Sequence, residues 1–242
     1  MKDLGRYLLL MYSLFIRREK FKVYVRLVVD ECITVGINSV FIVTLVSLFI
    51  GAVTAVQTAH NLVSDFIPVT VIGMITRDMT VLELSPTILS VVLAGKVGSN
   101  IAGHLGTMRI TEQIDALEVM GINSSSYLIL PKIIACMITF PLLVIISGFL
   151  SIYGGFLAAT LTNELTPEEY IIGIRMDFIE FNIWFALIKS LVFAFLIASI
   201  SSYKGFYTRG GALEVGQSST GAVTSSCVAI LSADYLLAQL IL

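Results

Sequence analysis

The chain runs from Cys32 to Ser64 without a single Asp, Glu, Lys or Arg. A helix needs about 20 apolar residues to cross the hydrocarbon core of a bilayer, so this stretch alone is long enough to span a membrane. Of the 242 residues, 57% are hydrophobic and 13% are charged, against about 25% charged residues in soluble domains. Within lipid a helix satisfies its own backbone hydrogen bonds, and the alternating pattern of a transmembrane barrel is absent. We therefore predict an all-α integral membrane protein.

Five apolar stretches are candidates for membrane-spanning helices. They cover approximately Val35–Ala59, Ser85–Gly103, Ile133–Leu161, Phe181–Tyr203 and Gly221–Leu240. The pair Ser85-Pro86 suits a helix N-cap followed by proline at the first helical position, although a transmembrane helix tolerates proline and could begin earlier. We expect a single domain over residues 1–242, with the five-span bundle in residues 35–242.

The first 31 residues carry seven Lys and Arg residues among aromatic and aliphatic side chains. The apolar run from Tyr7 to Ile16 is followed by further positive charge, unlike the charge-free core of a signal peptide. We predict that residues 1–31 form an amphipathic helix on an anionic membrane surface; a solvated basic tail is the alternative. No Lys or Arg follows Arg209. This asymmetry predicts a cytoplasmic N-terminus, cytoplasmic loops near residues 104–126 and 204–220, and a C-terminus outside.

The segment Met108–Gly121 is too short and too charged to span a membrane. Spacings of three and four put apolar residues on one helical face and acidic residues on the other; they are Ile110, Ile114 and Leu117, and Glu112, Asp115 and Glu118. Gly121 suits the end of such a helix. Acidic residues gain nothing from an anionic membrane surface. We therefore interpret the segment as a helix that docks on a protein partner, with a solvated loop helix as the alternative.

Small residues spaced by four form two ridges on the second span, as close helix packing in lipid requires. The ridges are Gly95, Ser99 and Gly103, and Gly98, Ala102 and Gly106. They serve either packing within the subunit or a subunit contact or cavity wall.

Three ionisable residues, Lys96, Lys189 and Asp234, lie within predicted spans. Charges buried in a membrane pair with one another or face a cavity. At about 1.5 Å per residue, Lys189 lies about 12 Å and Asp234 about 9 Å below the outer ends of their helices. We predict that these two side chains pair, and that Lys96 meets backbone carbonyls or a lipid phosphate.

The sequence lacks the motifs of several common catalytic and binding sites. It has no G-x-x-x-x-G-K-[ST] phosphate loop and no H-E-x-x-H motif, and its net charge of −2 argues against nucleic acid. The three cysteines lie far apart in apolar runs and the two histidines are isolated, so we expect no disulfide, metal or cofactor. Any energy input must come from an ion gradient or a partner.

Together, the motifs match a known family. They include Glu83-Leu84-Ser85-Pro86, Ala94-Gly95-Lys96-Val97-Gly98-Ser99 and Met108-Arg109-x-Thr111-Glu112-Gln113-Ile114-Asp115-Ala116-Leu117-Glu118. In these residues, and again at Ile188–Ala194 and Gly210–Val223, the chain resembles the MlaE (YrbE) family of permeases, the membrane subunits of lipid-trafficking ABC transporters.

The resemblance implies a homodimer in a bacterial inner membrane, assembled with two ABC ATPase subunits and an MCE-domain protein. ATP and Mg would bind to the ATPase, and the chain itself would be no enzyme. The coupling helix would dock on the ATPase through Arg109, Thr111, Glu112, Gln113, Asp115, Glu118 and Gly121. A cavity between the two permeases, for phospholipid or a similar lipid, would involve Glu83, Leu84, Ser85 and Lys96.

Within that cavity, we expect the lipid headgroup to contact Glu83, Ser85 and Lys189, and its acyl chains to contact spans one, two and five. Two positions depart from the family pattern. Lys96 stands where many members have arginine, which retains the charge but loses the two-donor fork. Leu82 stands where an arginine often precedes the glutamate, which weakens the case for a charge pair at Glu83.

Two other functions stay open at this point. An ion-coupled secondary transporter would use Lys96, Lys189 and Asp234 as a relay, although five spans without inverted repeats argue against it. A non-transporting scaffold would anchor a cytoplasmic enzyme through Met108–Gly121. The first alternative predicts dependence on an ion gradient, and the second predicts partner binding without bound lipid.

Overall fold

The computed structural model describes residues 2–14, 21–61, 68–162 and 165–241. These residues fold into helices and connecting turns and contain no β-strand. Within these residues, five helices are long and apolar enough to cross a membrane: Lys22–Asn61, Val71–Ile110, Ser124–Leu161, Phe181–Phe206 and Ala212–Ile241. The prediction of an all-α membrane protein with five spans is therefore confirmed.

The first two spans change their hydrogen-bond spacing along their length. Span one consists of α2 (Phe21–Cys32), the π-helix η1 (Ile33–Ile37) and α3 (Asn38–Asn61). Span two consists of α4 (Val71–Met79), the π-helix η2 (Thr80–Ile88), α5 (Leu89–Leu93), the π-helix η3 (Ala94–Gly98) and α6 (Ser99–Ile110). Spans three to five are α8 (Ser124–Leu161), α10 (Phe181–Phe206) and α11 (Ala212–Ile241). Three shorter helices are α1 (Lys2–Ser13), α7 (Gln113–Val119) and α9 (Pro167–Arg175).

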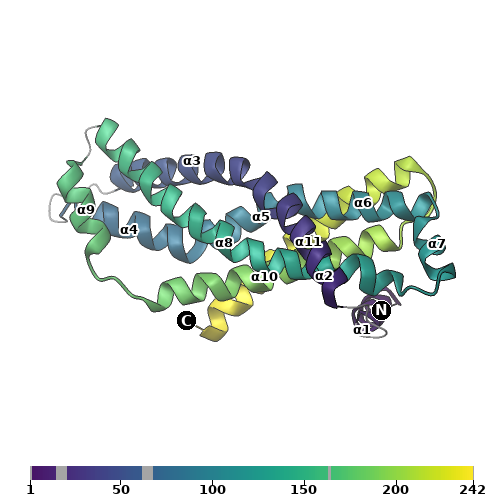
Figure 1. The fold of residues 1–242 in the computed structure, drawn as a ribbon. Coiled ribbons are helices and arrows are strands. Elements are labelled where there is room, and N and C mark those ends of the chain that lie inside the picture. Colours follow the sequence, from purple (N-terminus) through teal and green to yellow (C-terminus); the bar gives the residue numbers. More distant parts are fainter. Residues whose placement is uncertain (1, 15–20, 62–67, 163–164, 242) are drawn as a thin grey trace.

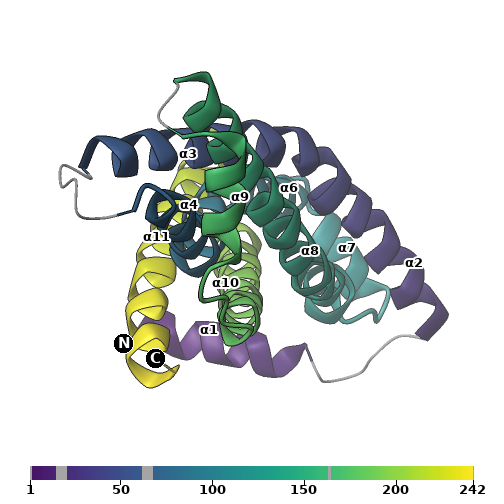
Figure 2. The same cartoon turned by 90° about the vertical axis from the view of Figure 1, so that its left-hand side faces the viewer.

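The spans run side by side in an elongated bundle, with α1 and α7 at one end and α9 at the other (Figure 1). We name these the α7 end and the α9 end. Seen along the bundle from the α9 end, α1 lies across the spans rather than parallel to them (Figure 2). The central helix is α10, which packs against α6, α8, α11 and η2. Phe185, Lys189 and Phe193 of α10 are fully buried.

The prediction that span two begins at Ser85 is wrong. Helical structure starts at Val71 and continues through Pro86, which lies inside η2. Proline within a helix removes one backbone donor, and its ring clashes with the carbonyl of the preceding turn. A π-helical turn changes the local hydrogen-bond spacing, and a transmembrane helix tolerates such adjustments. The N-cap pattern at Ser85-Pro86 therefore marks a local widening of the span and not its start.

The predicted N-terminal helix is present, but the described residues divide it into α1 and α2 and do not form one helix over residues 1–31. α2 continues without a break through η1 into α3, and both α1 and α2 run at an angle to the long spans (Figures 1 and 2). Residues 15–20, with three of the seven predicted cations, lie outside the described residues. Leu10 of α1 and Leu14, which follows the helix, are buried in the bundle core, while Leu8, Leu9 and Tyr12 of α1 are exposed. One apolar face of α1 therefore packs on the protein, and a second apolar face is available to contact lipid.

Glycine lets the backbones of α3 and α8 touch. A Cβ atom at Gly51 would lie 1.7 Å from the Ser151 carbonyl oxygen, and one at Gly154 would lie 2.2 Å from that of Leu48. On span two, the ridge with Gly98 and Gly106 faces neighbouring spans of the same chain, near Ser201 and Val215. This ridge therefore packs within the subunit. In contrast, a Cβ at Gly95 of the other ridge would meet nothing within 4 Å.

Candidate functional site

Three spans meet at the ammonium group of Lys189, whose side chain is fully buried. Its Nζ atom lies 2.7 Å from Asp234 Oδ1 of α11 and 2.9 Å from Glu83 Oε1 of η2. Nζ also donates to the Leu82 carbonyl oxygen at 3.1 Å, and it lies 4.7 Å from the centre of the Phe185 ring. The two residues predicted to pair are thus in contact, and Glu83 joins them despite leucine at position 82. We name Glu83, Lys189 and Asp234 the charge triad.

The charge triad links spans two, four and five and leaves one carboxylate group exposed. Removing one partner of a buried ion pair leaves an uncompensated charge, which is far costlier than losing both. Here one buried cation serves two carboxylates, and the Glu83 side chain remains 49% exposed. With one cation and two carboxylates, the triad has a formal net charge of −1. The exposed Glu83 carboxylate is open to a ligand or a neighbouring molecule at the side of the bundle.

Next to the triad along η2 lies an apolar cavity of about 310 Å³. Spans two, three and four and the segment before α10 form its walls, and Arg77 and Ser85 are its only polar lining residues in the described part of the chain. The apolar lining comes from Val81, Val144, Ile145, Gly148, Phe149, Ile152, Ile174, Phe178, Ile183, Ala186 and Leu187. Cavities of this size and character bind apolar ligands.

The four residues predicted for a lipid cavity lie in different places in the single chain. Of Glu83, Leu84, Ser85 and Lys96, only Ser85 lines the cavity. Lys96 lies in a separate hollow beside Glu31, where its Nζ donates to the Asn38 carbonyl oxygen. The walls of this cavity come from spans two, three and four of one chain. The lipid cavity that the resemblance implies would lie between two permeases, so its expected contacts with spans one, two and five stay a prediction. The continuous helix from Val71 brings Arg77 and Val81 to the apolar cavity, which the assumed start at Ser85 had excluded.

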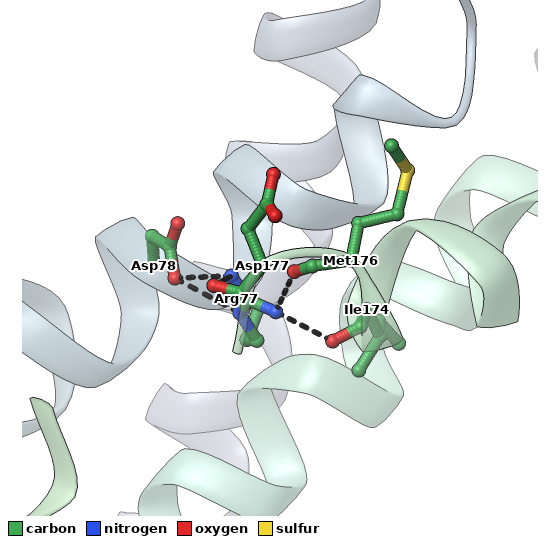
Figure 3. A network of polar contacts seen from close by, with 5 residues as sticks. All are labelled: Arg77, Asp78, Ile174, Met176 and Asp177. Atoms are coloured by element: carbon green, nitrogen blue, oxygen red, sulfur yellow. Dashed lines mark hydrogen bonds and ion pairs between the residues drawn. The ribbon is translucent and has the colours of Figure 1, made fainter. Parts of the chain in front are cut away.

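Arg77 is the residue that sequence reasoning missed (Figure 3). Its side chain is 3% exposed, and its Nη1 donates to the carbonyls of Ile174 at 2.7 Å and Met176 at 2.5 Å. Nη2 donates to the Asp177 carbonyl at 3.3 Å and pairs with Asp78 at 2.8 Å, and Nε donates to Asp78 at 2.9 Å. All five N–H donors of the guanidinium thus have partners. The available signal was a lone Arg in the segment between spans one and two.

Local structure holds the carbonyls that Arg77 contacts. α9 begins with a capping box between Thr166 and Glu169, and these hydrogen bonds from Thr166 lower the pKa of the Glu169 carboxyl. A Cβ atom at Gly173 would lie 2.0 Å from the Thr70 carbonyl oxygen, so α9 packs directly on α4. Asp177 then adopts a left-handed conformation with φ 45°, which turns the chain toward α10. Arg77 therefore fixes the segment that closes the apolar cavity at the α9 end.

At the other end, Met108–Gly121 is not one continuous helix. Glu112 adopts a left-handed conformation with φ 60° and separates α6 from α7. Of the predicted apolar face, Ile114 is fully buried, while Ile110 and Leu117 are partly exposed. Gly121, with φ 79°, ends α7 in a Schellman motif, in which Ile122 N–H donates to the Leu117 carbonyl at 3.1 Å.

The predicted coupling residues lie around this short helix. Arg109 Nη1 pairs with Asp115 Oδ1 at 2.6 Å, and Glu118 Oε1 accepts a hydrogen bond from Ser124 at 2.8 Å. Thr111, Glu112, Gln113 and Gly121 are exposed. Sequence reasoning missed Val119 and Met120, which are 89% and 66% exposed. The α7 end therefore presents both acidic and apolar groups.

Comparison with known proteins identifies the family. The family model described as "Permease MlaE" matches residues 28–240. A probable ABC transporter permease protein of Rickettsia bellii is 34% identical over 217 residues, covering 90% of this chain and 83% of the relative. A probable ABC transporter permease protein of Synechocystis is 34% identical over 206 residues, covering 85% and 78%.

A plant protein is also related. The chloroplast protein named TRIGALACTOSYLDIACYLGLYCEROL 1 of Arabidopsis thaliana is 31% identical over 220 residues, covering 91% of this chain and 63% of the plant protein. The family match covers the five spans, the charge triad, the apolar cavity and α7 alike. This chain belongs to the MlaE permease family.

Proposed function

We propose that this chain is the membrane subunit of an ATP-driven ABC transporter that moves phospholipid or a similar lipid between membranes. The observation that carries the proposal is the charge triad beside the 310 Å³ apolar cavity. An amphiphile needs an apolar volume for its chains and a polar group for its head, and both occur here side by side. The name of the plant relative includes the name of a glycolipid, which agrees with a lipid substrate.

In the proposed transporter the headgroup contacts the half-exposed Glu83 carboxylate, while acyl chains enter past Ser85 into the cavity. A cationic or hydroxyl-bearing headgroup suits a triad with a surplus carboxylate. Lys189 is occupied by its two carboxylates and acts mainly by holding Glu83 in place. Transport then requires the cavity to bind lipid differently in two states, because only differential binding can transmit work.

Two ATPase subunits supply the energy in this proposal, with ATP and Mg bound on them. Each docks on α7, whose acidic side chains suit a basic groove and whose exposed Val119 and Met120 suit an apolar one. Because α7 joins α6 directly to α8, a push on α7 reaches spans two and three, which form two walls of the cavity. The α7 end is then cytoplasmic and the α9 end faces an MCE-domain protein outside a bacterial inner membrane.

A second copy of the chain covers α11 in the proposed homodimer. Of the most apolar 18-residue stretch of α11, only 17% is buried within the subunit, which is the smallest share among the five spans. Polar and small residues lie on its exposed face, namely Gly216, Gln217, Thr220, Thr224, Ser232 and Gln239. In lipid, small residues permit close helix approach and polar ones bond across helices. Large apolar residues, among them Val228, Leu231 and Leu236, are exposed on the same helix. The polar and small positions of this mixed face suit another helix better than they suit acyl chains.

Gentle affinity purification from native membranes, followed by mass spectrometry of proteins and lipids, tests the proposal. We expect two copies of this chain, an ABC ATPase, an MCE-domain protein and bound phospholipid. A lone chain without ATPase or lipid would refute it and favour an ion-coupled transporter that uses the triad as a relay. A partner enzyme without lipid would favour a scaffold.

A further inference from the structure

A second polar site lies between span one and span two, closer to the α7 end than the charge triad. Its hollow has a volume of about 20 Å³ and is lined by Glu31, Thr34, Val35, Ser39, Lys96, Val97, Asn100 and Ile101. We name it the α2–α6 hollow. A site of one probe sphere, about 10–15 Å³, already holds a water molecule. The hollow therefore accepts one oxygen atom of a larger group whose remainder stays outside.

The hollow carries a net positive charge. Glu31 is neutralised by Lys132, with which it forms an ion pair from α8. Lys96 has no carboxylate within ion-pair distance among the described residues, and the hydrogen bond to the Asn38 carbonyl is its only one there. Since an ammonium group has three donors, two remain to bind an anion.

Other groups around Lys96 are also free to bind. The hydroxyl of Ser39 is fully buried, lines the hollow and has no hydrogen-bond partner among the described residues. Asn100 and His104 are exposed and follow Lys96 at spacings of four along span two, so they lie on one face. The hollow thus continues into an exposed polar stripe with further donors.

The depth of the hollow matches the level of lipid headgroups. Tyr7 of α1 donates to Ser199 of α10 at 2.8 Å, and an amphipathic helix of this kind lies at the boundary between headgroups and acyl chains. A Cβ atom at Gly98 would lie 2.9 Å from Ser201 Oγ, so Lys96, two residues away, lies at nearly the same level. The cation therefore lies near the level of α1, within reach of a lipid headgroup if α1 rests at that boundary on the α7 side.

We propose that the α2–α6 hollow binds the phosphate of a phospholipid in the leaflet on the α7 side. One phosphate oxygen enters the hollow to accept from Lys96 and Ser39, while the glycerol and acyl chains follow the exposed stripe outside. The site is separate from the apolar cavity and holds whether or not the chain transports lipid.

Photo-crosslinking tests this site in the full-length protein. The probe is phosphatidylethanolamine with a diazirine on its headgroup, and adducts are mapped to peptides by mass spectrometry. We expect adducts near residues 31–39 and 96–104. Lys96→Met should reduce them by about tenfold or more, because it removes every charge-assisted hydrogen bond from Lys96 to the phosphate. Lys96→Arg should retain them, and so should Lys204→Met, which removes a cation from the end of α10 and serves as the matched control.

Competitors separate the remaining explanations. Unlabelled phosphatidic acid should abolish the adducts, whereas diacylglycerol with the same chains should not. Equal loss with millimolar inorganic phosphate would show a free-anion site and overturn the lipid assignment. Adducts unchanged by Lys96→Met would overturn the site itself, as would adducts replaced by crosslinks between two copies of the chain. Adducts near Glu83 report on the apolar cavity, so failure at either site is recognised independently.

Discussion

Arg77 offers a direct test of how the α9 end is held closed. Arg77→Met retains an apolar stem of similar length but removes all five donors. Three backbone carbonyls, those of Ile174, Met176 and Asp177, then lose a charged partner. These hydrogen bonds are part-buried, and one hydrogen bond to a charged group contributes about 1.5–3 kcal/mol. We therefore take about 3 kcal/mol, the value of one to two such bonds, for the loss of all three. The substitution lowers the free energy of local opening of the segment between α9 and α10, and not that of unfolding the whole bundle.

Hydrogen exchange of the purified protein measures that opening. Because about 1.4 kcal/mol corresponds to a factor of ten, the Met176 amide and its neighbours should exchange about 100-fold faster in Arg77→Met. Amides in the middle of α8 and α11 should keep their protection. Arg175→Met is the matched control, since Arg175 is exposed on the same segment. Equal exchange in the two variants would refute the clamp.

Two further substitutions test the charge triad and α7. Asp234→Asn retains the shape but removes one carboxylate, so we expect lower thermal stability and reduced lipid binding in purified protein; unchanged stability and binding would show that the triad is not structural. Glu118→Lys reverses a charge on α7 and removes the bond to Ser124, and should reduce ATP-driven transport about tenfold, or about 1.4 kcal/mol in coupling, with normal membrane insertion. Glu168→Lys, at the α9 end, is its control, and normal transport by the Glu118 variant would refute the coupling role.

The sequence was sufficient for the number and type of spans because lipid leaves the backbone few choices. Hydrophobic length identified all five helices, and a rise of 1.5 Å per residue was enough to match the depths of Lys189 and Asp234. Their side chains are 2.7 Å apart. Depth alone could not show that Glu83 shares the same ammonium, since that contact depends on how span two rotates.

The errors arose where local rules compete with the membrane. Ser85-Pro86 follows the N-cap pattern of soluble helices, but the π-helix η2 accommodates the proline within span two. Because span two was assumed to start at Ser85, Arg77 was assigned to a loop and its place in the wall of the apolar cavity was missed. Similarly, Phe21–Cys32 has enough charge to suggest a surface helix, yet nothing in it interrupts the helix that becomes span one. The left-handed Glu112 that separates α6 from α7 leaves no signature in a run of good helix formers.

Lipid movement driven by ATP is the central claim. The most direct test reconstitutes this chain, with the ATPase and MCE-domain protein that co-purify, into vesicles containing fluorescent phospholipid. We predict that lipid transfer to acceptor vesicles requires ATP and stops when the ATPase is made unable to hydrolyse it. Transfer that continues without ATP but follows an ion gradient would contradict the account, as would an active ATPase that moves no lipid.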